Sequence, residues 1–160
     1  MSIVNQSYAA ACIEKLLIKK GKNGQAVLTA TNIDPEIITG LLTYLCGVLN
    51  EQKNLYAMRA LFRVVQLSST QVLQFSDTLG GTLNKFITDM ASDENDQSPN
   101  YAYILFETTA LTLKFLRTSP DQMAQLQSIV APSLNVILEK NRLELMGYAF
   151  QIYALFVASS

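Results

Sequence analysis

Five basic residues occupy corresponding positions in three similar segments, and they are the side chains best suited to recognition chemistry. Each segment opens with a tyrosine, and the basic residues follow it by three, seven or eleven residues, which is helical spacing along one face. Such a ridge suits the carboxylates of an acidic protein surface. The alternative is an ordinary solvated helix face. The five residues are Lys15, Lys19, Arg59, Arg63 and Lys114.

Motifs for catalysis or cofactor binding are absent from the sequence. The chain has no histidine, the commonest general base and zinc ligand. The segment Leu79-Gly80-Gly81-Thr82 is not followed by the Gly-Lys-Ser/Thr of a phosphate-binding loop. Three acidic residues, Asp93, Glu94 and Asp96, have neither the spacing nor the glycine of a calcium-binding loop. We therefore expect a non-enzyme with no cofactor and no metal.

The composition indicates which kinds of partner the protein does not bind and in which compartment it works. Twelve lysines and arginines nearly balance thirteen acidic residues, so we expect no nucleic-acid-binding surface and no anionic membrane partner. Polar side chains interrupt every apolar stretch before it reaches the length of a membrane span. Cys12 and Cys46 lie in apolar helical patterns, and the first residues lack a secretory signal. We therefore expect buried free thiols in a soluble intracellular protein.

The tyrosine-led segments divide the chain into repeats. They begin at Tyr8, Tyr56, Tyr103 and Tyr148, which are 48, 47 and 45 residues apart. A period in this range, with two helical patterns in each unit, is typical of HEAT and armadillo solenoids, which act as binding scaffolds. The tyrosine rings have two interpretations: they pack between repeats, or they contact a partner directly.

The predicted fold is all-α: an α-α superhelix of the HEAT or armadillo type, with about seven antiparallel helices in roughly three and a half repeats. The tyrosine-led helices are the second members of their pairs. We expect residues 1–160 to form a single block of a longer solenoid, because apolar residues near both ends suit neighbouring repeats. The half repeat covers 1–20, and the full repeats cover about 33–68, 70–118 and 119–160.

Capping signals define two helix starts. Asp34 followed by Pro35 predicts an N-cap and the first helical residue. Ser119, Pro120 and Gln122 predict a capping box, in which the serine and glutamine side chains bond each other's backbone.

Two helix-breaking signals fall inside helical patterns. Gly80-Gly81 predicts a bend in a helix expected over about residues 71–90, because each glycine costs roughly 1 kcal/mol relative to alanine. Pro132 predicts a kink without an end, because the apolar pattern continues past it.

One face of each tyrosine-led helix is expected in the core. The positions one, five, eight and nine residues after each tyrosine are mostly apolar and share a helical face. These residues are Ala9, Ile13, Leu16 and Leu17; Ala57, Leu61, Val64 and Val65; Ile104, Thr108, Leu111 and Thr112; and Ala149, Tyr153, Phe156 and Val157.

Several stretches carry a family resemblance. The most specific are Asn54 to Ala60, Asn100 to Glu107 and Tyr148 to Ile152. They resemble the CAS/CSE exportins, the importin-alpha re-exporters of the karyopherin-beta family. The helix that begins at Tyr8-Ala9-Ala10 and the segment from Thr31 to Leu49 fit the preceding family sequence in the same order. Gly80-Gly81 departs from the family's apolar helix.

The resemblance implies a nuclear export receptor that shuttles between nucleus and cytoplasm. Family members bind importin-alpha together with Ran-GTP in the nucleus, cross the pore, and release both after GTP hydrolysis. Importin-alpha and Ran-GTP are therefore the implied partners, with nuclear pore proteins as further candidates. The tyrosine-led helices line the concave side of family solenoids, so the five cations would face cargo or GTPase. No family motif assigns a partner to an individual residue of this sequence.

Two alternatives keep a helical fold. A HEAT-repeat adaptor of another karyopherin or of the phosphatase-scaffold type would have the same fold and a different partner. A small helical enzyme would require a pocket with a strongly perturbed carboxylate.

Overall fold

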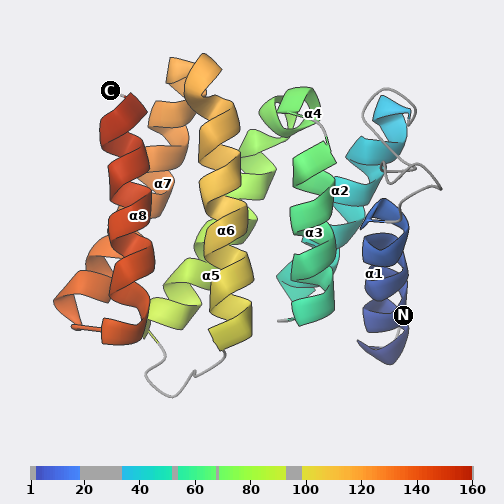
Figure 1. Ribbon diagram of the computed structural model, residues 1–160, viewed down its shortest axis with the longest axis horizontal. Helices are drawn as coiled ribbons and strands as arrows, with labels where there is room; N and C mark the ends of the chain where they lie inside the picture. Colours follow the sequence, from blue (N-terminus) through green and yellow to red (C-terminus); the bar gives the residue numbers. More distant parts are fainter. Residues whose placement is uncertain (1–2, 19–33, 52–53, 68, 93–98, 160) are drawn as a thin grey trace. The chain divides into compact units, whose positions relative to one another are not determined.

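The chain is helical throughout the residues that its structure describes. The computed structural model describes residues 3–18, 34–51, 54–67, 69–92 and 99–159 (Figure 1), and every regular element in these ranges is helical. This confirms the predicted all-α class of the HEAT type. Within the same ranges, no helix has both the length and the apolar character needed to cross a membrane.

The first compact unit covers residues 1–75. Its described helices are α1 (Ile3–Ile18), α2 (Pro35–Glu51), α3 (Leu55–Leu67) and α4 (Ser69–Gln74). The central helix of this unit is α3, which packs against α1, α2 and α4.

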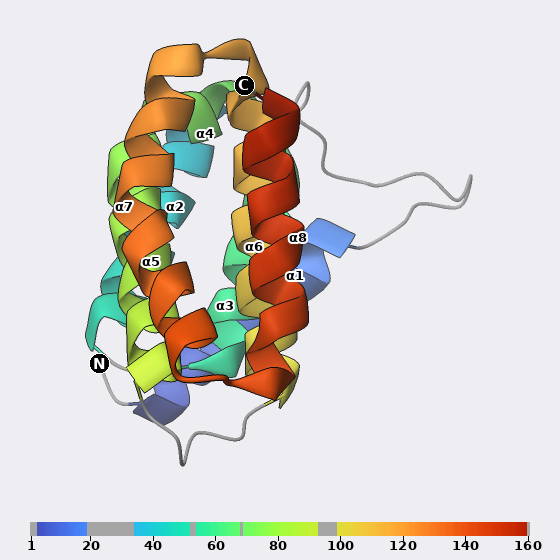
Figure 2. The ribbon, with the colours of Figure 1, turned by 90° about the vertical axis from the view of Figure 1, so that its left-hand side faces the viewer.

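The second compact unit covers residues 76–160. Its described elements are α5 (Ser76–Ser92), α6 (Pro99–Phe115), the 3-10 turn η1 (Leu116–Thr118), α7 (Pro120–Glu139) and α8 (Leu143–Ser159). Figure 2 shows two layers in this unit, with α5 beside α7 and α6 beside α8. Both helix pairs of the unit therefore contribute one helix to each layer, as in stacked HEAT repeats.

The predicted start of α2 is confirmed. Oδ1 of Asp34 accepts a hydrogen bond from the backbone N–H of Glu36 at 2.9 Å, and its carbonyl accepts one from the N–H of Ile37 at 2.9 Å. Pro35 is the first helical residue, where a backbone N–H would have no helical partner. The local sequence is sufficient to fix this end.

The core face predicted for α3 is also confirmed. Ala57, Leu61, Val64 and Val65 are fully buried. Burial of an aliphatic side chain as large as leucine or valine contributes about 1.5–3 kcal/mol, so this face is a major part of the core of the first unit.

The equivalent face of α6 buries threonines. Thr108 and Thr112 of this face and the adjacent Thr109 are fully buried. Each hydroxyl donates to the carbonyl four residues earlier, at 2.7 Å for Thr108, 2.8 Å for Thr112 and 2.9 Å for Thr109. These bonds inside the helix satisfy hydroxyls that would otherwise be costly to bury.

The core prediction fails at the end of α8, where Val157 is exposed. Val157 lies about 80° around the helix from the buried Ala149, at the edge of the face. Val65, at the same repeat position, is buried because α3 packs against three helices, whereas α8 packs against α6 and α7.

The helix expected over about residues 71–90 is divided five residues before the glycines. A turn at Phe75 separates α4 from α5, and Gly80 and Gly81 both lie inside α5. Gly80 instead allows close packing, because a Cβ atom there would lie 2.6 Å from Cδ1 of Leu126 on α7. The expected single helix is therefore two helices, and the second of them continues through the glycines at which a bend was predicted.

The capping box predicted at Ser119 does not form. Pro120 begins α7 as predicted, but the side chain of Ser119 makes no capping hydrogen bond. Nε2 of Gln122 donates to Oγ of Ser76 at 3.0 Å, which links α7 to the start of α5. A tertiary hydrogen bond has replaced the local bond that the sequence predicted.

The prediction that α7 continues past Pro132 is confirmed. The next residue, Ser133, is buried and donates from Oγ to Oδ1 of Asn84 at 2.6 Å. Oγ of Ser133 then accepts from the hydroxyl of Thr88 at 2.7 Å. These bonds fix the register of α7 against α5.

The prediction of two buried thiols holds for only one of them. Cys46 is buried, but Cys12 is exposed. Apolar residues occur on every side of α1, so its sequence pattern does not separate the side that faces α3 from the side that faces solvent.

Candidate partner-binding surface

Two side-chain contacts fix the register of α1 against α3 in the first unit. Nδ2 of Asn54 donates to Oγ of Ser7 at 2.9 Å, and further along both helices Nε of Arg63 lies 3.8 Å from Oε2 of Glu14. Residue numbers rise in the same direction on both helices, so α1 and α3 run parallel with an offset of 47 to 49 residues. The offset matches the spacing of the first two tyrosines.

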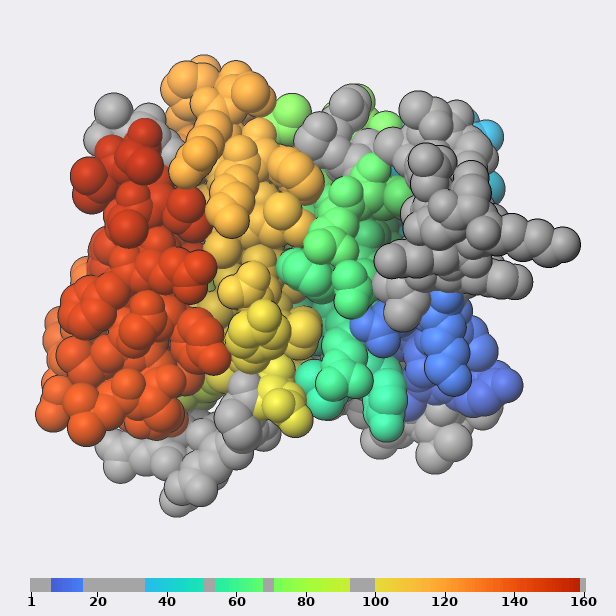
Figure 3. Space-filling model, in the orientation of Figure 1, coloured from blue at the N-terminus to red at the C-terminus, as the bar shows by residue number. Residues whose placement is uncertain are grey.

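This register sets Tyr8 of α1 beside Tyr56 of α3. Figure 3 shows α1 and α3 side by side on one face of the first unit. Both tyrosines are exposed, Tyr8 to 74% and Tyr56 to 49%. They therefore occupy equivalent exposed positions on neighbouring helices, outside the core.

Basic residues follow the tyrosine pair along the same two helices. Lys15 is exposed on α1, and Arg59 and Arg63 are partly exposed on α3. The register sets Lys15 beside Arg63, with Arg59 one helical turn nearer to the tyrosines. Three members of the predicted ridge therefore share one face, while Lys19 lies outside the described residues.

Arg63 is partly engaged inside the unit. Besides its ion pair with Glu14, its Nη1 donates to Oε1 of Gln66 at 3.2 Å, and its guanidinium lies 5.6 Å from the centre of the Phe62 ring. Among the described residues, neither Lys15 nor Arg59 forms an ion pair. Within the described part of the chain, these two are therefore the cations of the face that have no ion-pair partner.

The fifth predicted cation, Lys114, is exposed on α6 of the second unit. The ridge does not recur on this helix, because Phe106 and Ala110, three and seven residues after Tyr103, are buried. The Phe106 ring stacks on the Tyr148 ring of α8, with centroids 4.9 Å apart and planes within 2° of parallel. On α6 the predicted ridge therefore consists of Lys114 alone.

The four repeat tyrosines differ in their environment. Tyr148 packs between helices through its stack on Phe106, as the structural interpretation requires. Tyr103 is 52% exposed, like Tyr8 and Tyr56. Only α1 and α3 thus set two exposed tyrosines beside each other among the described helices.

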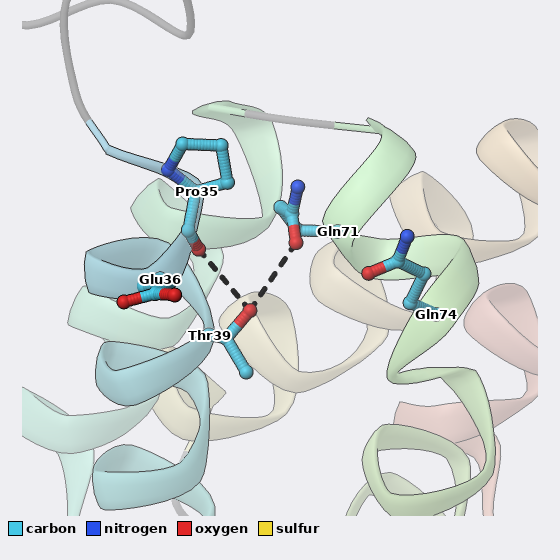
Figure 4. Close-up of a pocket in the computed structure, with 5 residues that line it drawn as sticks. All are labelled: Pro35, Glu36, Thr39, Gln71 and Gln74. Carbon is cyan, nitrogen blue, oxygen red and sulfur yellow. Dashed lines mark hydrogen bonds between the residues drawn. The ribbon is translucent and has the colours of Figure 1, made fainter.

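An open pocket of about 370 Å³ lies between α2 and α4 in the first unit (Figure 4). Its lining residues are Pro35, Glu36, Thr39, Gln71 and Gln74. Oγ1 of Thr39 lies 3.1 Å from the Pro35 carbonyl and 3.2 Å from Oε1 of Gln71. The partners of the Thr39 hydroxyl are thus a backbone carbonyl and an amide oxygen, neither of which is a base that could activate it as a nucleophile.

The part of the chain that the structure describes also brings together no metal site. No three histidine, cysteine, aspartate or glutamate side chains gather there as ligands. The acidic residues Asp93, Glu94 and Asp96 lie outside the described residues.

Arg142 is a buried cation that the sequence analysis missed. Its Nη1 donates to the carbonyls of Met90 and Ala91, at 2.8 and 3.3 Å, in the last turn of α5. Its Nε donates to Oε1 of Glu144 at 2.6 Å. A hydrogen bond from the backbone of Glu144, followed by that from Arg142, holds the pKa of this carboxyl below its ordinary value. A lone arginine between two helical patterns was the available sequence signal.

A family comparison places this helical architecture among known proteins. The model of the CAS/CSE protein C-terminus matches residues 14–160. The chain belongs to the CAS/CSE family. The CAS/CSE match includes most of the first unit and the whole of the second, so the tyrosine and arginine face of α3 lies within it.

Individual CAS/CSE relatives agree with this assignment. Proteins named Exportin-2 from Danio rerio, Homo sapiens and Drosophila melanogaster are 26%, 27% and 27% identical to the chain over 157, 158 and 155 residues. The alignments cover 96%, 96% and 94% of this chain. The chain spans 16% of the length of each of these relatives.

Proposed function

We propose that the chain is a segment of a nuclear export receptor. It is a HEAT-repeat scaffold that helps to bind importin-alpha and Ran-GTP for transport from nucleus to cytoplasm. The family match over residues 14–160 carries this proposal, and the name Exportin-2 of its relatives supports it. The mechanism is recognition, with no bond made or broken, so the segment needs no catalytic residue and no cofactor. A receptor of this kind shuttles between the two compartments and passes nuclear pore proteins.

The contacts that we propose are the predicted cations. Lys15, Arg59 and Arg63 share the α1–α3 face. We propose Lys19, which follows Lys15 in the sequence, and Lys114 of the second unit as further contacts of the ridge. A single exposed ion pair is worth about 0.2–1 kcal/mol, so these residues would act collectively.

The alternative is a HEAT-repeat adaptor of another karyopherin or of the phosphatase-scaffold type. It would use the same helical face for a different partner. The CAS/CSE match favours the export receptor over this alternative.

Titration of the full chain with importin-alpha, with and without Ran-GTP, tests the proposal. We expect salt-sensitive binding that the Arg59→Ala/Arg63→Ala double variant weakens. Arg117→Ala, which removes an exposed cation of the second unit, is the matched control. Absence of binding at high micromolar concentration, under both conditions, would overturn the proposed role of this segment in recognition.

A further inference from the structure

We infer that the α1–α3 face docks an extended acidic segment of a partner protein, in which an apolar side chain lies about three residues from the acidic ones. The face is defined by Tyr8, Lys15, Tyr56, Arg59 and Arg63. This inference deepens the proposed function by stating the chemistry of the partner, and it rests on that function only for the partner's identity.

The order of side chains along the two helices sets the length of the segment. The tyrosine pair lies nearest to the Asn54–Ser7 contact, and Lys15 follows Tyr8 by seven residues. At the rise of an α-helix, seven residues advance about 10 Å. An extended peptide covers that distance in about three residues.

The tyrosine pair supplies the apolar part of the site. Two exposed rings at equivalent positions of neighbouring helices offer aromatic surface with a polar hydroxyl at the edge, which suits an apolar side chain that enters from water. Tyrosine and arginine are also the residue types enriched where partner proteins bind most tightly. In the second unit, Tyr148 is stacked on Phe106, so the exposed Tyr103 has no exposed tyrosine at the equivalent position of the neighbouring helix.

The cations make the face favour acidic segments. Three of them, Lys15, Arg59 and Arg63, share the face with a single described carboxylate, Glu14, which is paired with Arg63. A partner carboxylate should bind most favourably beside Lys15 and Arg59, because these two cations form no ion pair within the described residues. Glu14 repels the same carboxylate, so it acts as an internal competitor.

The same charges argue against a second copy of the chain as the occupant. Two identical faces would set cations against cations, which is unfavourable. The net charge of the chain is −1, so a general attraction for nucleic acid has no support either.

Fluorescence anisotropy with short labelled peptides tests the inference on the full chain. One peptide carries a phenylalanine three residues before two glutamates, a second has the reverse order, and a third replaces both glutamates by glutamine. We expect one of the two acidic peptides to bind in a salt-sensitive manner and the glutamine peptide to bind at least about tenfold more weakly. Equal binding of the acidic and glutamine peptides would overturn the inference.

Five variants separate this site from general surface charge. The Tyr8→Ala/Tyr56→Ala variant should lower affinity about tenfold, and Lys15→Gln or Arg59→Gln about two- to fivefold. Glu14→Gln should raise affinity, because it removes the competing carboxylate. Tyr103→Ala, matched in exposure and repeat position, should leave affinity unchanged. Circular dichroism melting confirms that each variant is folded.

Three results would overturn the inference. Tyr103→Ala could weaken binding as much as the double tyrosine variant. Heparin or an oligonucleotide could bind as tightly as the acidic peptide and independently of the tyrosines. Sedimentation could show a dimer that the double tyrosine variant abolishes. Loss of importin-alpha binding with intact peptide binding would overturn the proposed function alone, and the reverse pattern would overturn this inference alone.

Discussion

Nη1 of Arg142 donates a hydrogen bond of 2.8 Å to the backbone carbonyl of Met90, 52 residues earlier in the chain. The same nitrogen lies 3.3 Å from the carbonyl of Ala91, so one buried guanidinium caps the C-terminal end of α5. The last carbonyls of a helix lack partners inside the helix, and a cation there also gains from the helix dipole. Because Arg142 lies in the connection between α7 and α8, three helices meet at this side chain.

Replacement of Arg142 by methionine should lower the free energy of unfolding of the second unit by about 2–3 kcal/mol. The two carbonyls would lose charge-assisted hydrogen bonds and remain buried. Urea denaturation followed by circular dichroism measures the change. Arg117→Met, at an exposed position, should stay within about 0.5 kcal/mol of the parent chain. Equal midpoints for both variants would contradict the capping role.

The pKa of Glu144 makes its contribution dependent on pH. Because the pKa is lowered in the folded state, ionised Glu144 stabilises the fold above its unfolded pKa, and the stabilisation is lost as the pH falls through the folded pKa. The unfolding free energy of Glu144→Gln should therefore differ most from the parent chain near neutral pH. The difference should shrink below the ordinary glutamate pKa of about 4.3. A difference that stays constant from pH 7 to pH 3 would contradict this assignment.

Two adjacent glycines in α5 should respond differently to alanine. Gly81→Ala should stabilise the chain by about 0.5–1 kcal/mol, because alanine favours the helix and its Cβ would enter open space. The free energy of unfolding of Gly80→Ala should be lower than that of Gly81→Ala by roughly 1–3 kcal/mol, because the new Cβ atom at position 80 displaces the side chain of Leu126. Thermal unfolding of both variants measures the difference. In the Leu126→Ala background, the two alanine substitutions should become nearly equivalent, and a persistent gap would exclude the steric explanation.

Asn54 should stabilise the first unit through two separable hydrogen bonds. Its Oδ1 accepts from the N–H of Ala57 at 3.1 Å at the start of α3, while its Nδ2 donates to Ser7 on α1. Asn54→Ala removes both bonds and should cost about 1–2 kcal/mol. Asn54→Asp keeps the cap and loses the donor, so its unfolding midpoint in urea should lie between those of the parent chain and the alanine variant. An aspartate variant as unstable as the alanine variant would show that the cap contributes little.

The two thiols should react at different rates. Cys12 is exposed and Cys46 is buried, so a thiol reagent under native conditions should modify one cysteine rapidly and the second only as the chain unfolds. Absorbance with an aromatic disulfide reagent gives both rates. Cys12→Ser should remove the rapid phase, and retention of that phase would contradict the exposure of Cys12.

Local features of the fold could be predicted from the sequence. Asp34 and Pro35 fix the start of α2 because their bonds run to the adjacent turn. The buried face of α3, from Ala57 to Val65, follows from helical periodicity because neighbours surround that helix. The tyrosine period of 48 residues also matches the offset of α1 against α3, which the contacts of Asn54 and Arg63 define.

Features that depend on distant neighbours could not be predicted. Gln122 bonds Ser76 instead of the helix start next to it, because the partner lies 46 residues away on a packed helix. The ridge expected on α6 is core at Phe106, because Tyr148 arrives there from α8. For the candidate site, the sequence identified the cations, but it could not show that Arg63 would be paired with Glu14.

The threonine hydroxyls of α6 bond within their own helix, which affects how the helices of the second unit are held together. Thr108, Thr109 and Thr112 direct their hydrogen bonds back into their own helix, so these hydroxyls do not tether α6 to its neighbours. In the other layer, directional bonds from Ser133 to Asn84 and from Gln122 to Ser76 join α7 to α5. When the second unit is bent, the side-chain hydrogen bonds between α5 and α7 should resist sliding in that layer, and the threonine hydroxyls of α6 add no such resistance to the other layer. We therefore expect the second unit to deform more easily between α6 and α8 than between α5 and α7.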